Sequence, residues 1–186
     1  MTATTDVVVI GGGQAGLAAG YYLRRAGLDF AVLDAAEAPG GAWQHYWESL
    51  RLFSPAAYSP LPGRPMPGQA GQLWPGAEHV TEYLAEYEKR YELPVHRPVS
   101  VTSVTDAGDR GLLVHTDDGT RHTRVAPLTL RAGERGRIAT TGTRAVSDPR
   151  VHLLGYGDWT GPASATLIGV GRTARQAVTE TTDLLR

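Results

Sequence analysis

Residues 7–10 (Val-Val-Val-Ile) form an uninterrupted apolar run that is followed at once by the pattern Gly11-x-Gly13-x-x-Gly16. Such a run is typical of a strand that is buried on both faces. Gly11 permits a tight turn, Gly13 lets the backbone approach a pyrophosphate, and Gly16 lets the following helix pack close to the strand. The pattern therefore predicts a strand–turn–helix unit that binds a dinucleotide.

The residues after these glycines complete the unit. A helix is predicted from about Gln14 to Ala26, so the N–H groups of Gln14 and Ala15 and the positive end of the helix dipole would face the phosphates. Residues 28–33 are expected to form a second strand, and Asp34 follows near the usual spacing of about 20 residues. Its carboxylate would accept hydrogen bonds from ribose hydroxyls and repel a 2′-phosphate, which argues against NADP in this site. The alternative is a glycine-rich turn that binds nothing.

Composition limits the classes of protein to which the chain can belong. With 186 residues and a net charge of −1, we expect one domain with a real core, and the charge favours neither nucleic acid nor an anionic membrane as partner. No apolar run approaches the ~18 residues of a membrane span and no signal-peptide pattern is present, so a cytoplasmic location is expected. The chain has no cysteine, which excludes disulfides and thiol chemistry. The six histidines lack metal-ligand spacing, so no metal site is predicted.

A second glycine cluster follows the acid. The cluster Gly40-Gly41-x-Trp43 precedes Leu-Arg-Leu-Phe-Ser-Pro at residues 50–55 and Leu-Pro-Gly at residues 61–63. In these segments the chain resembles the flavin-containing monooxygenases and their Baeyer–Villiger relatives. The resemblance implies FAD as cofactor, with Gly40, Gly41 and Trp43 near its pyrophosphate and flavin. The residue types are compatible, because glycines permit close backbone approach and an indole offers a flat apolar face with one N–H donor. Alternatively Trp43 and Trp47 are core aromatics, which is the preferred interpretation for Trp47.

The middle of the chain combines an irregular segment, one helix and three short strands. Residues 54–76 are too rich in proline and glycine for regular structure, and they form either a cover over substrate or flavin or a mobile surface lid. Residues 78–91 predict a helix whose tyrosine-containing stripe we assign to core packing. Alternation predicts three antiparallel strands, at residues 99–105, 111–116 and 120–125. In the resembled family such a meander covers the parallel sheet, and the residue at the place of Val104 meets the adenine through its backbone.

The C-terminal part contains a second candidate cofactor segment. Residues 151–158 are expected to form a strand that ends in Gly157-Asp158, and a helix is predicted from about Ala163 to Leu184. This segment resembles the second FAD motif of two-domain flavoprotein oxidoreductases. The resemblance implies that the aspartate binds the ribityl chain and that the helix directs its N-terminus at the flavin. It thereby implies four cofactor contacts, at Gly157, Asp158, Ala165 and Thr166. Without a ligand, Asp158 would be a helix-capping acid.

Two further patterns are not assigned to ligands. Residues 169–174 fit G-x-G-x-x-A, but they lie inside the predicted C-terminal helix and no acid follows at the required distance. We interpret their small residues as sites of close helix packing. Residues 139–142 are similar to the A-T-G motif at the family's domain crossing, but their context from Arg137 to Arg144 predicts a polar turn.

These elements together predict an α/β fold. We expect a single three-layer, Rossmann-like FAD-binding domain, with a parallel sheet, helices on one face and an antiparallel β meander on the other. The family's FAD domain is discontinuous, and it would correspond to about residues 1–125 and 145–186, joined without the usual NADPH domain. The strand that carries the family's A-T-G motif is also expected to be missing. An empty sheet position would expose apolar surface and favour a homo-oligomer.

The resemblance implies an FAD-dependent oxidoreductase that oxygenates a small nucleophilic or carbonyl substrate. Because no NADPH domain is recognised, NADPH is expected only as an external reductant, and an electron-donor partner is the other source. Two alternatives stay open: a non-catalytic flavin-binding or electron-transfer module, and a plain NAD-binding Rossmann protein. No side chain stands out as a general acid or base, so none is named as catalytic.

Overall fold

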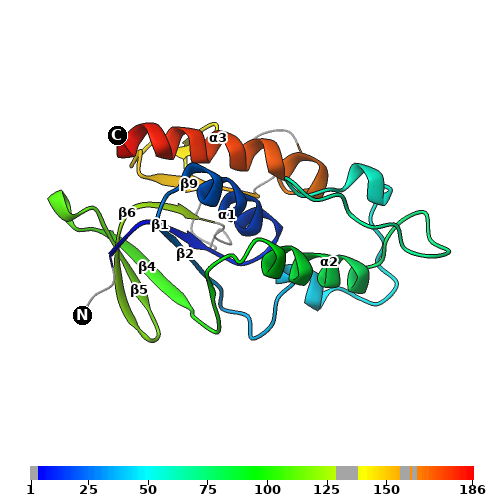
Figure 1. Ribbon diagram of the computed structural model, residues 1–186. Coiled ribbons are helices and arrows are strands. Elements are labelled where there is room, and N and C mark those ends of the chain that lie inside the picture. Colours follow the sequence, from blue (N-terminus) through cyan, green and yellow to red (C-terminus); the bar gives the residue numbers. More distant parts are fainter. Residues whose placement is uncertain (1–3, 129–137, 156–159, 161–162) are drawn as a thin grey trace.

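The computed structural model describes residues 4–128, 138–155, 160 and 163–186, and a β-sheet forms its centre (Figure 1). Strands β1 (Thr4–Ile10), β2 (Phe30–Leu33) and β3 (Val95–His96) are parallel and lie in the order β3-β2-β1. On the other side of β1 lie β6 (Gly119–Leu128) and then β9 (Val151–Leu153), both also parallel. The predicted parallel sheet, with the strand before the glycine turn at its centre, is confirmed.

The antiparallel meander is attached to this sheet through β6. Strand β4 (Val101–Asp106) pairs with β5 (Leu112–Thr116), which pairs with the first half of β6. A short 3₁₀ helix, η3 (Gly108–Arg110), lies between β4 and β5. The polar turn expected at residues 137–144 contributes to a small hairpin of β7 (Thr140–Thr141) and β8 (Arg144–Ala145), which pairs with β9.

The length of β6 corrects one expectation. The third meander strand was predicted to end at Val125, and the loss of the strand that carries the A-T-G motif was expected to leave a sheet position empty. Instead β6 continues to Leu128, and its last residues, Ala126 to Leu128, pair in register with β9 while Leu128 also pairs with Ile10 of β1. The position between β1 and β9 is therefore filled. Pro127 lacks one N–H donor but keeps its carbonyl, so it does not end the strand.

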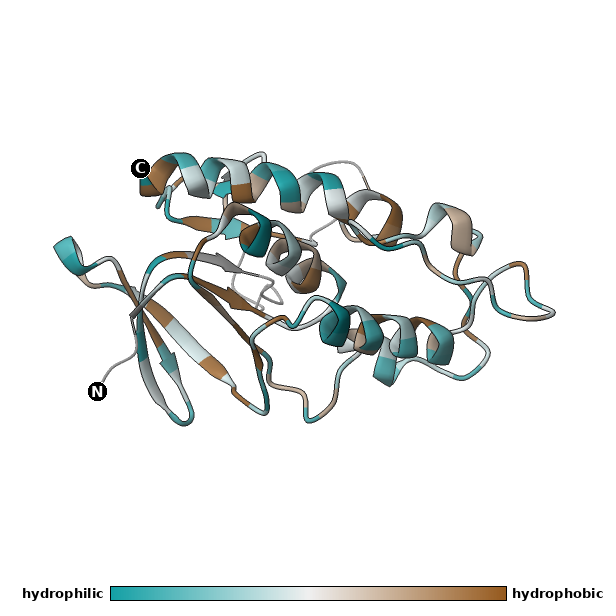
Figure 2. Cartoon of the chain, viewed as in Figure 1, coloured by the Kyte–Doolittle hydropathy of each residue, from teal (hydrophilic) through white to brown (hydrophobic). Residues whose placement is uncertain are grey.

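Three helices cover one face of the sheet: α1 (Gln14–Ala26), α2 (Ala77–Arg90) and α3 (Leu167–Leu185). The side chains of β1 alternate between the two faces. Val7 and Val9 pack into the cluster that contains the helices, whereas Val8 and Ile10 pack into the cluster that contains the meander. Apolar and polar residues also alternate along α3 (Figure 2). The predicted three-layer fold is thus confirmed, and none of the described helices is long and apolar enough to cross a membrane.

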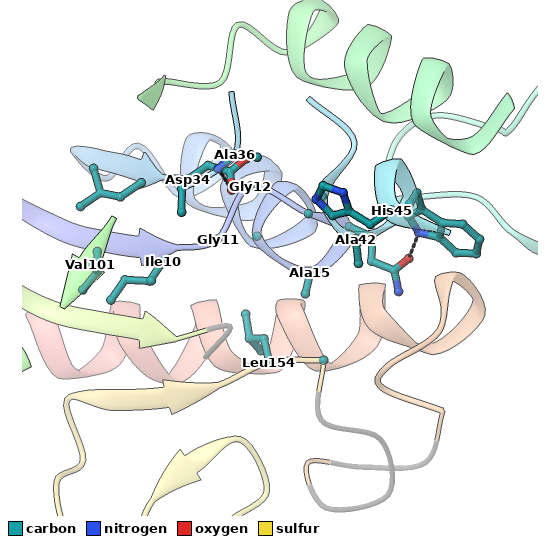
Figure 3. Close-up of a pocket in the computed structure, with 18 of the residues that line it drawn as sticks. Ile10, Gly11, Gly12, Ala15, Asp34, Ala36, Ala42, His45, Val101 and Leu154 are labelled. Atoms are coloured by element: carbon teal, nitrogen blue, oxygen red, sulfur yellow. Dashed lines mark hydrogen bonds between the residues drawn. The ribbon is translucent and has the colours of Figure 1, made fainter. Parts of the chain in front are cut away.

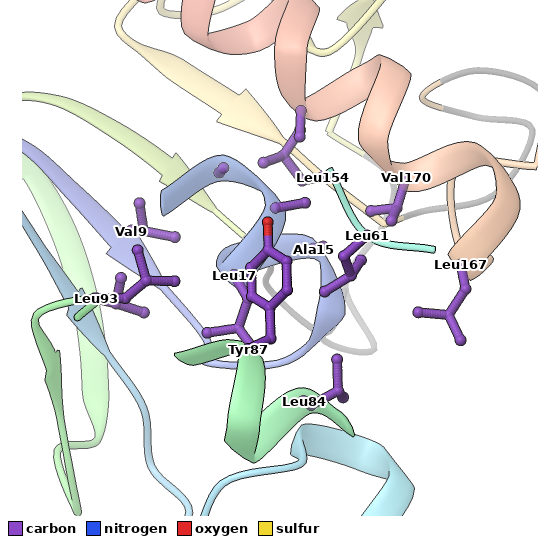
Figure 4. Packing of buried hydrophobic residues seen from close by; sticks show 14 of the residues in the cluster. Val9, Ala15, Leu17, Leu61, Leu84, Tyr87, Leu93, Leu154, Leu167 and Val170 are labelled. Atoms are coloured by element: carbon purple, nitrogen blue, oxygen red, sulfur yellow. The ribbon is translucent and has the colours of Figure 1, made fainter. Parts of the chain in front are cut away.

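The tyrosine stripe of α2 lies in the core and also fixes the proline-rich segment. Tyr87 is fully buried beside Leu17 of α1 (Figure 4), and its hydroxyl donates to the Pro62 carbonyl at 2.6 Å. The Tyr83 hydroxyl accepts from the Leu61 N–H and donates to the Arg64 carbonyl, both at 2.7 Å. Core packing by the stripe is confirmed. These bonds hold residues 61–64 of the segment to α2.

Helix α3 begins four residues later than predicted. Ala163 has a left-handed backbone with φ of 57°, so it cannot belong to the helix. Thr166 is the N-cap, and its hydroxyl accepts from the Gly169 N–H at 3.2 Å. A threonine at this position satisfies one of the free N–H groups in the first turn. Gly169 and Gly171 lie inside α3, as expected, where they approach Ala163 and Pro62 closely.

Candidate functional site

A cavity of about 820 Å³ opens where β1 and β2 end and α1 begins (Figure 3). Ile10 and Val101 lie toward one end of it, and Ala42 and His45 toward the other. Its size falls in the range of about 300–1,000 Å³ that is usual for small-molecule sites. Nine of the predicted site residues line it: Gly11, Gly13, Gln14, Ala15, Gly16, Asp34, Gly41, Trp43 and Ala165.

The N-terminus of α1 is built to receive an anion. Its N-cap is Gly13, no side chain caps its first N–H groups, and no acid lies in its first turn. The lining contains no described lysine or arginine, so the helix N–H groups and dipole supply the positive potential. Gly16 allows this arrangement, because a Cβ there would lie 1.9 Å from the Gly11 carbonyl oxygen. The turn and the helix therefore meet in direct backbone contact.

The loop after β2 returns to the same turn. Gly41 has φ of 55° and begins the 3₁₀ helix η1 (Gly41–His45). A Cβ on Gly41 would lie 2.6 Å from the Gly13 Cα, so only glycine fits against the turn here. Gly40 is buried and does not line the cavity, and a Cβ on it would meet Thr81 of α2. The glycine pair thus places one residue at the cavity and packs the other against α2.

Gln14 joins two rims of the cavity. Its side-chain oxygen accepts from the Trp43 indole N–H at 3.0 Å, and its amide donates to the Ala165 carbonyl at 2.8 Å. The three residues come from α1, from η1 and from the segment before α3. Because one amide bonds to both other segments, the orientation of the Trp43 ring is fixed relative to Ala165.

Asp34 is a buried carboxylate at the end of β2. Its side chain is 10% exposed, and its Oδ2 accepts from the Arg97 Nε at 2.8 Å. Arg97 also donates to both oxygens of Glu88 on α2, at 2.7 and 2.8 Å. Burial on its own lowers the pKa of Arg97, but the hydrogen bonds to Glu88 and Asp34 outweigh it and raise this pKa above its usual value. Sequence reasoning missed Arg97, which carries no local motif.

Some predicted residues do not reach the cavity. Val104 packs against the core under the meander, and Val99, Ser100 and Val101 line the cavity in its place. Thr166 caps α3 and is not part of the lining. Gly157 and Asp158 lie outside the described residues.

The cavity also includes residues that sequence reasoning did not single out. Leu154 and Gly155 line it directly after β9, at the edge of the sheet where ligands of α/β folds bind. His45 and Tyr46 line it from η1 and the residue after it. Trp47, expected in the core, is 63% exposed, so that expectation was wrong. The residues between the two tryptophans, Gln-His-Tyr at 44–46, contain no pattern that predicts the exposure of Trp47. The described residues contain no cluster of potential metal ligands.

Known proteins resemble this chain over most of its length. The pyridine nucleotide-disulphide oxidoreductase family matches residues 8–126. An uncharacterized CzcO-like oxidoreductase from Geobacillus kaustophilus is 38% identical over 99 residues, which are 53% of this chain and 28% of that protein. The structure of a flavin-containing monooxygenase from Stenotrophomonas maltophilia has a TM-score of 0.90 and 29% identity, with 100% of both chains covered. A cyclohexanone monooxygenase from Rhodococcus sp. Phi1 shares the fold, with a TM-score of 0.65 and 22% identity over 77% of this chain and 29% of that chain.

The residues present fit an adenine dinucleotide. The uncapped start of α1 suits a pyrophosphate, the carboxylate of Asp34 suits a ribose, and the close approach of Gly41 to Gly13 leaves backbone rather than side chains beside the phosphate turn. The cavity continues from there past Trp43 to Ala165. The chain belongs to the pyridine nucleotide-disulphide oxidoreductase family, and it has the fold of the flavin monooxygenases.

Proposed function

We propose that the chain is an FAD-binding oxidoreductase domain that takes electrons from a donor outside its own fold and acts on a small molecule. The observation that carries this proposal is the convergence of three segments on one cavity. These are the uncapped N-terminus of α1, the Gly41–Trp43 turn, and Ala165 before α3. A dinucleotide that is bound by the first βαβ unit alone would not need the Gly41–Trp43 turn or Ala165.

The cavity suggests how the cofactor lies. We assign the adenosine half to the end lined by Asp34, Val99 and Val101, because a ribose acid and apolar walls are found there. The pyrophosphate would sit on the α1 N–H groups, next to Gly13. The flavin half would then reach Trp43 and the Ala165 side of the cavity.

The chain's own contribution is positioning. When bound, FAD supplies two-electron transfer and, in its reduced form, reactivity toward oxygen. Gln14 holds Trp43 and Ala165 in place at the proposed flavin end. The N-terminus of α1 supplies preorganised N–H donors for the negative phosphates, without a side chain that must rearrange on binding. By resemblance to the second FAD motif, Gly157 and Asp158 belong to the same proposed site.

The proposed external electron supply rests on the short connection between β6 and β9. This connection covers residues 129–150 and includes the small β7–β8 hairpin. It is shorter than the roughly 30 residues of one βαβ unit, the minimum for a second dinucleotide site of the same kind. We therefore infer that NADPH, or a donor protein, reduces the flavin without a second nucleotide domain inserted there.

Ligand preference tests this proposal directly. Apoprotein is titrated with FAD, FMN, NAD⁺ and NADPH while tryptophan fluorescence is followed. FAD should bind most tightly and quench the signal of Trp43. Trp43→Phe should lose most of the quenching, whereas Trp74→Phe, which changes an exposed indole outside the cavity lining, should retain it. Tight binding of NAD⁺ with no binding of either flavin would contradict the proposal.

Turnover separates an enzyme from a passive flavin carrier. With FAD bound, NADPH oxidation should be slow in the absence of a partner, and chemical reduction followed by exposure to air should release hydrogen peroxide rapidly. Fast NADPH oxidation by the isolated chain would refute the external electron supply. No steady-state oxidation with any reductant would instead identify the chain as a flavin-binding or electron-transfer module.

A further inference from the structure

We propose that Arg97 is a positioning residue that orients the Asp34 carboxylate toward the adenosine ribose of the cofactor, an inference that rests on the proposed FAD function. The two side chains come from positions 63 residues apart and meet in an ion pair of 2.8 Å between Arg97 Nε and Asp34 Oδ2. Their side chains are only 11% and 10% exposed. Such a contact is screened little by solvent, so it restricts the carboxylate strongly.

Arg97 is itself fixed from the other side. Its two terminal nitrogens donate to the two carboxylate oxygens of Glu88 on α2, at 2.7 and 2.8 Å. This is the parallel, two-bond geometry that makes an arginine–carboxylate pair rigid. The guanidinium plane therefore cannot rotate freely, and the single Nε–H is left to hold Asp34. In this way α2 determines the orientation of an acid at the end of β2.

The arrangement leaves one oxygen of Asp34 for a ligand. Oδ2 is occupied by Arg97, whereas Oδ1 has a long 3.5 Å contact with the Ala36 N–H, and Asp34 lines the cavity. A carboxylate oxygen has two acceptor directions, so Oδ1 retains capacity for a ribose hydroxyl. By fixing Oδ2, Arg97 determines where Oδ1 points.

Gly12 couples this pair to the phosphate turn. A Cβ on Gly12 would lie 2.6 Å from Asp34 Oδ2 and 2.7 Å from Arg97 Nη2. The ion pair therefore lies directly against the backbone that precedes α1. The ribose acceptor and the pyrophosphate donors are thus held at a fixed separation, which is the preorganisation a dinucleotide site requires.

The charges of the cluster give it a second role in specificity. Two carboxylates, Asp34 and Glu88, share one guanidinium, so the cluster keeps a net negative charge. Nε and both terminal nitrogens of Arg97 already donate to these acids, whose two negative charges outweigh its single positive charge, so the cluster does not attract a 2′-phosphate. The site should therefore accept an adenosine with free ribose hydroxyls and reject its 2′-phosphorylated form.

The test compares FAD with FMN, which lacks the adenosine half. Arg97→Gln should weaken FAD binding by roughly ten- to a hundred-fold, the range expected when hydrogen bonds to a charged group are lost, and leave FMN binding unchanged. Arg97→Lys keeps the charge without the forked geometry and should fall between wild type and Arg97→Gln. Arg150→Gln is the matched control. Arg150 also binds two carboxylates, Asp106 and Asp148, but does not line the cavity or contact Asp34.

A thermodynamic cycle distinguishes orientation from simple stabilisation. Asp34→Asn alone should weaken FAD binding, and adding Arg97→Gln to it should cause little further loss. Equal losses for FAD and FMN in Arg97→Gln, or a lowered melting temperature with unchanged FAD affinity, would overturn the inference. If Arg97→Gln does not fold, Arg97→Lys decides by the same FAD-to-FMN comparison. If wild-type protein binds FMN but not FAD, or binds no flavin, the proposed function itself fails.

Discussion

Replacing Gly16 by alanine tests the contact that gives the cavity its shape. The new Cβ would lie 1.9 Å from the Gly11 carbonyl oxygen and 3.4 Å from Val9 Cγ1. The first of these atoms is backbone in a tight turn, so no side-chain rotation can relieve the clash. Helix α1 would have to move away from the end of β1, and the cavity would change with it.

Two opposing effects determine the size of the change. Alanine is favoured over glycine inside a helix by about 1 kcal/mol. Overpacking of a close contact usually costs about 1–3 kcal/mol, and more where backbone must shift. We therefore expect Gly16→Ala to lower the free energy of unfolding by about 2 kcal/mol. For a chain of this size that corresponds to a fall of roughly 4–8 °C in melting temperature.

Urea denaturation of the apoprotein measures this loss, and Gly13→Ala is the matched comparison. A Cβ on Gly13 meets only the Gly41 Cα at 3.7 Å, an ordinary contact, so this variant should lose less than about 1 kcal/mol through a weaker N-cap. It should nevertheless bind FAD poorly, because the methyl group enters the space next to the pyrophosphate. If Gly16→Ala is as stable as wild type, or no less stable than Gly13→Ala, the packing argument is refuted.

Three further substitutions test other parts of the account. Tyr87→Phe removes the donor to the Pro62 carbonyl and should cost about 1–2 kcal/mol of unfolding free energy in urea titrations; an unchanged midpoint would mean that the bond does not anchor the proline-rich segment. Thr166→Ala removes the cap of α3 and should cost about 1 kcal/mol by the same assay, whereas Thr166→Ser should not. Burial, opposed by the attraction of Glu180, lowers the pKa of His152 below its ordinary value of 6.5, so the unfolded chain binds more protons than the folded one. The contribution of His152 to the free energy of unfolding should therefore be constant above about pH 6.5 and decrease as the pH falls below it. If the free energy of unfolding of wild type and of His152→Gln changes with pH by the same slope, this assignment is contradicted.

Local patterns predicted the first cofactor unit well, because its signals lie within a few residues of one another. Helix α1 has the bounds expected, from Gln14 to Ala26, with Gly27 in the left-handed conformation after it. The glycine pattern and the apolar strand before it determine the structure of the residues next to them in the sequence. The pairing of the meander strands could also be predicted, because the alternation of apolar and polar residues and the turn at Asp117 are local features.

Features set by distant contacts could not be read in this way. The start of α3 depends on the left-handed backbone of Ala163, and nothing in the residues around an alanine predicts that conformation. The extension of β6 to Leu128 depends on pairing with β9, more than twenty residues later. Arg97 belongs to no sequence motif, and its bonds to Asp34 and Glu88 form only when the end of β2 and α2 lie side by side in the fold. The displacement of the cavity lining from Val104 to Val99–Val101 likewise needed the three-dimensional arrangement.

The identity of the bound cofactor tests the central claim most directly. The absorption spectrum of purified protein should show a flavin band near ~450 nm, and heat denaturation should release FAD rather than FMN. A colourless protein that restores no such band when FAD is added would contradict the account, because the cavity at the start of α1 would then not be a flavin site.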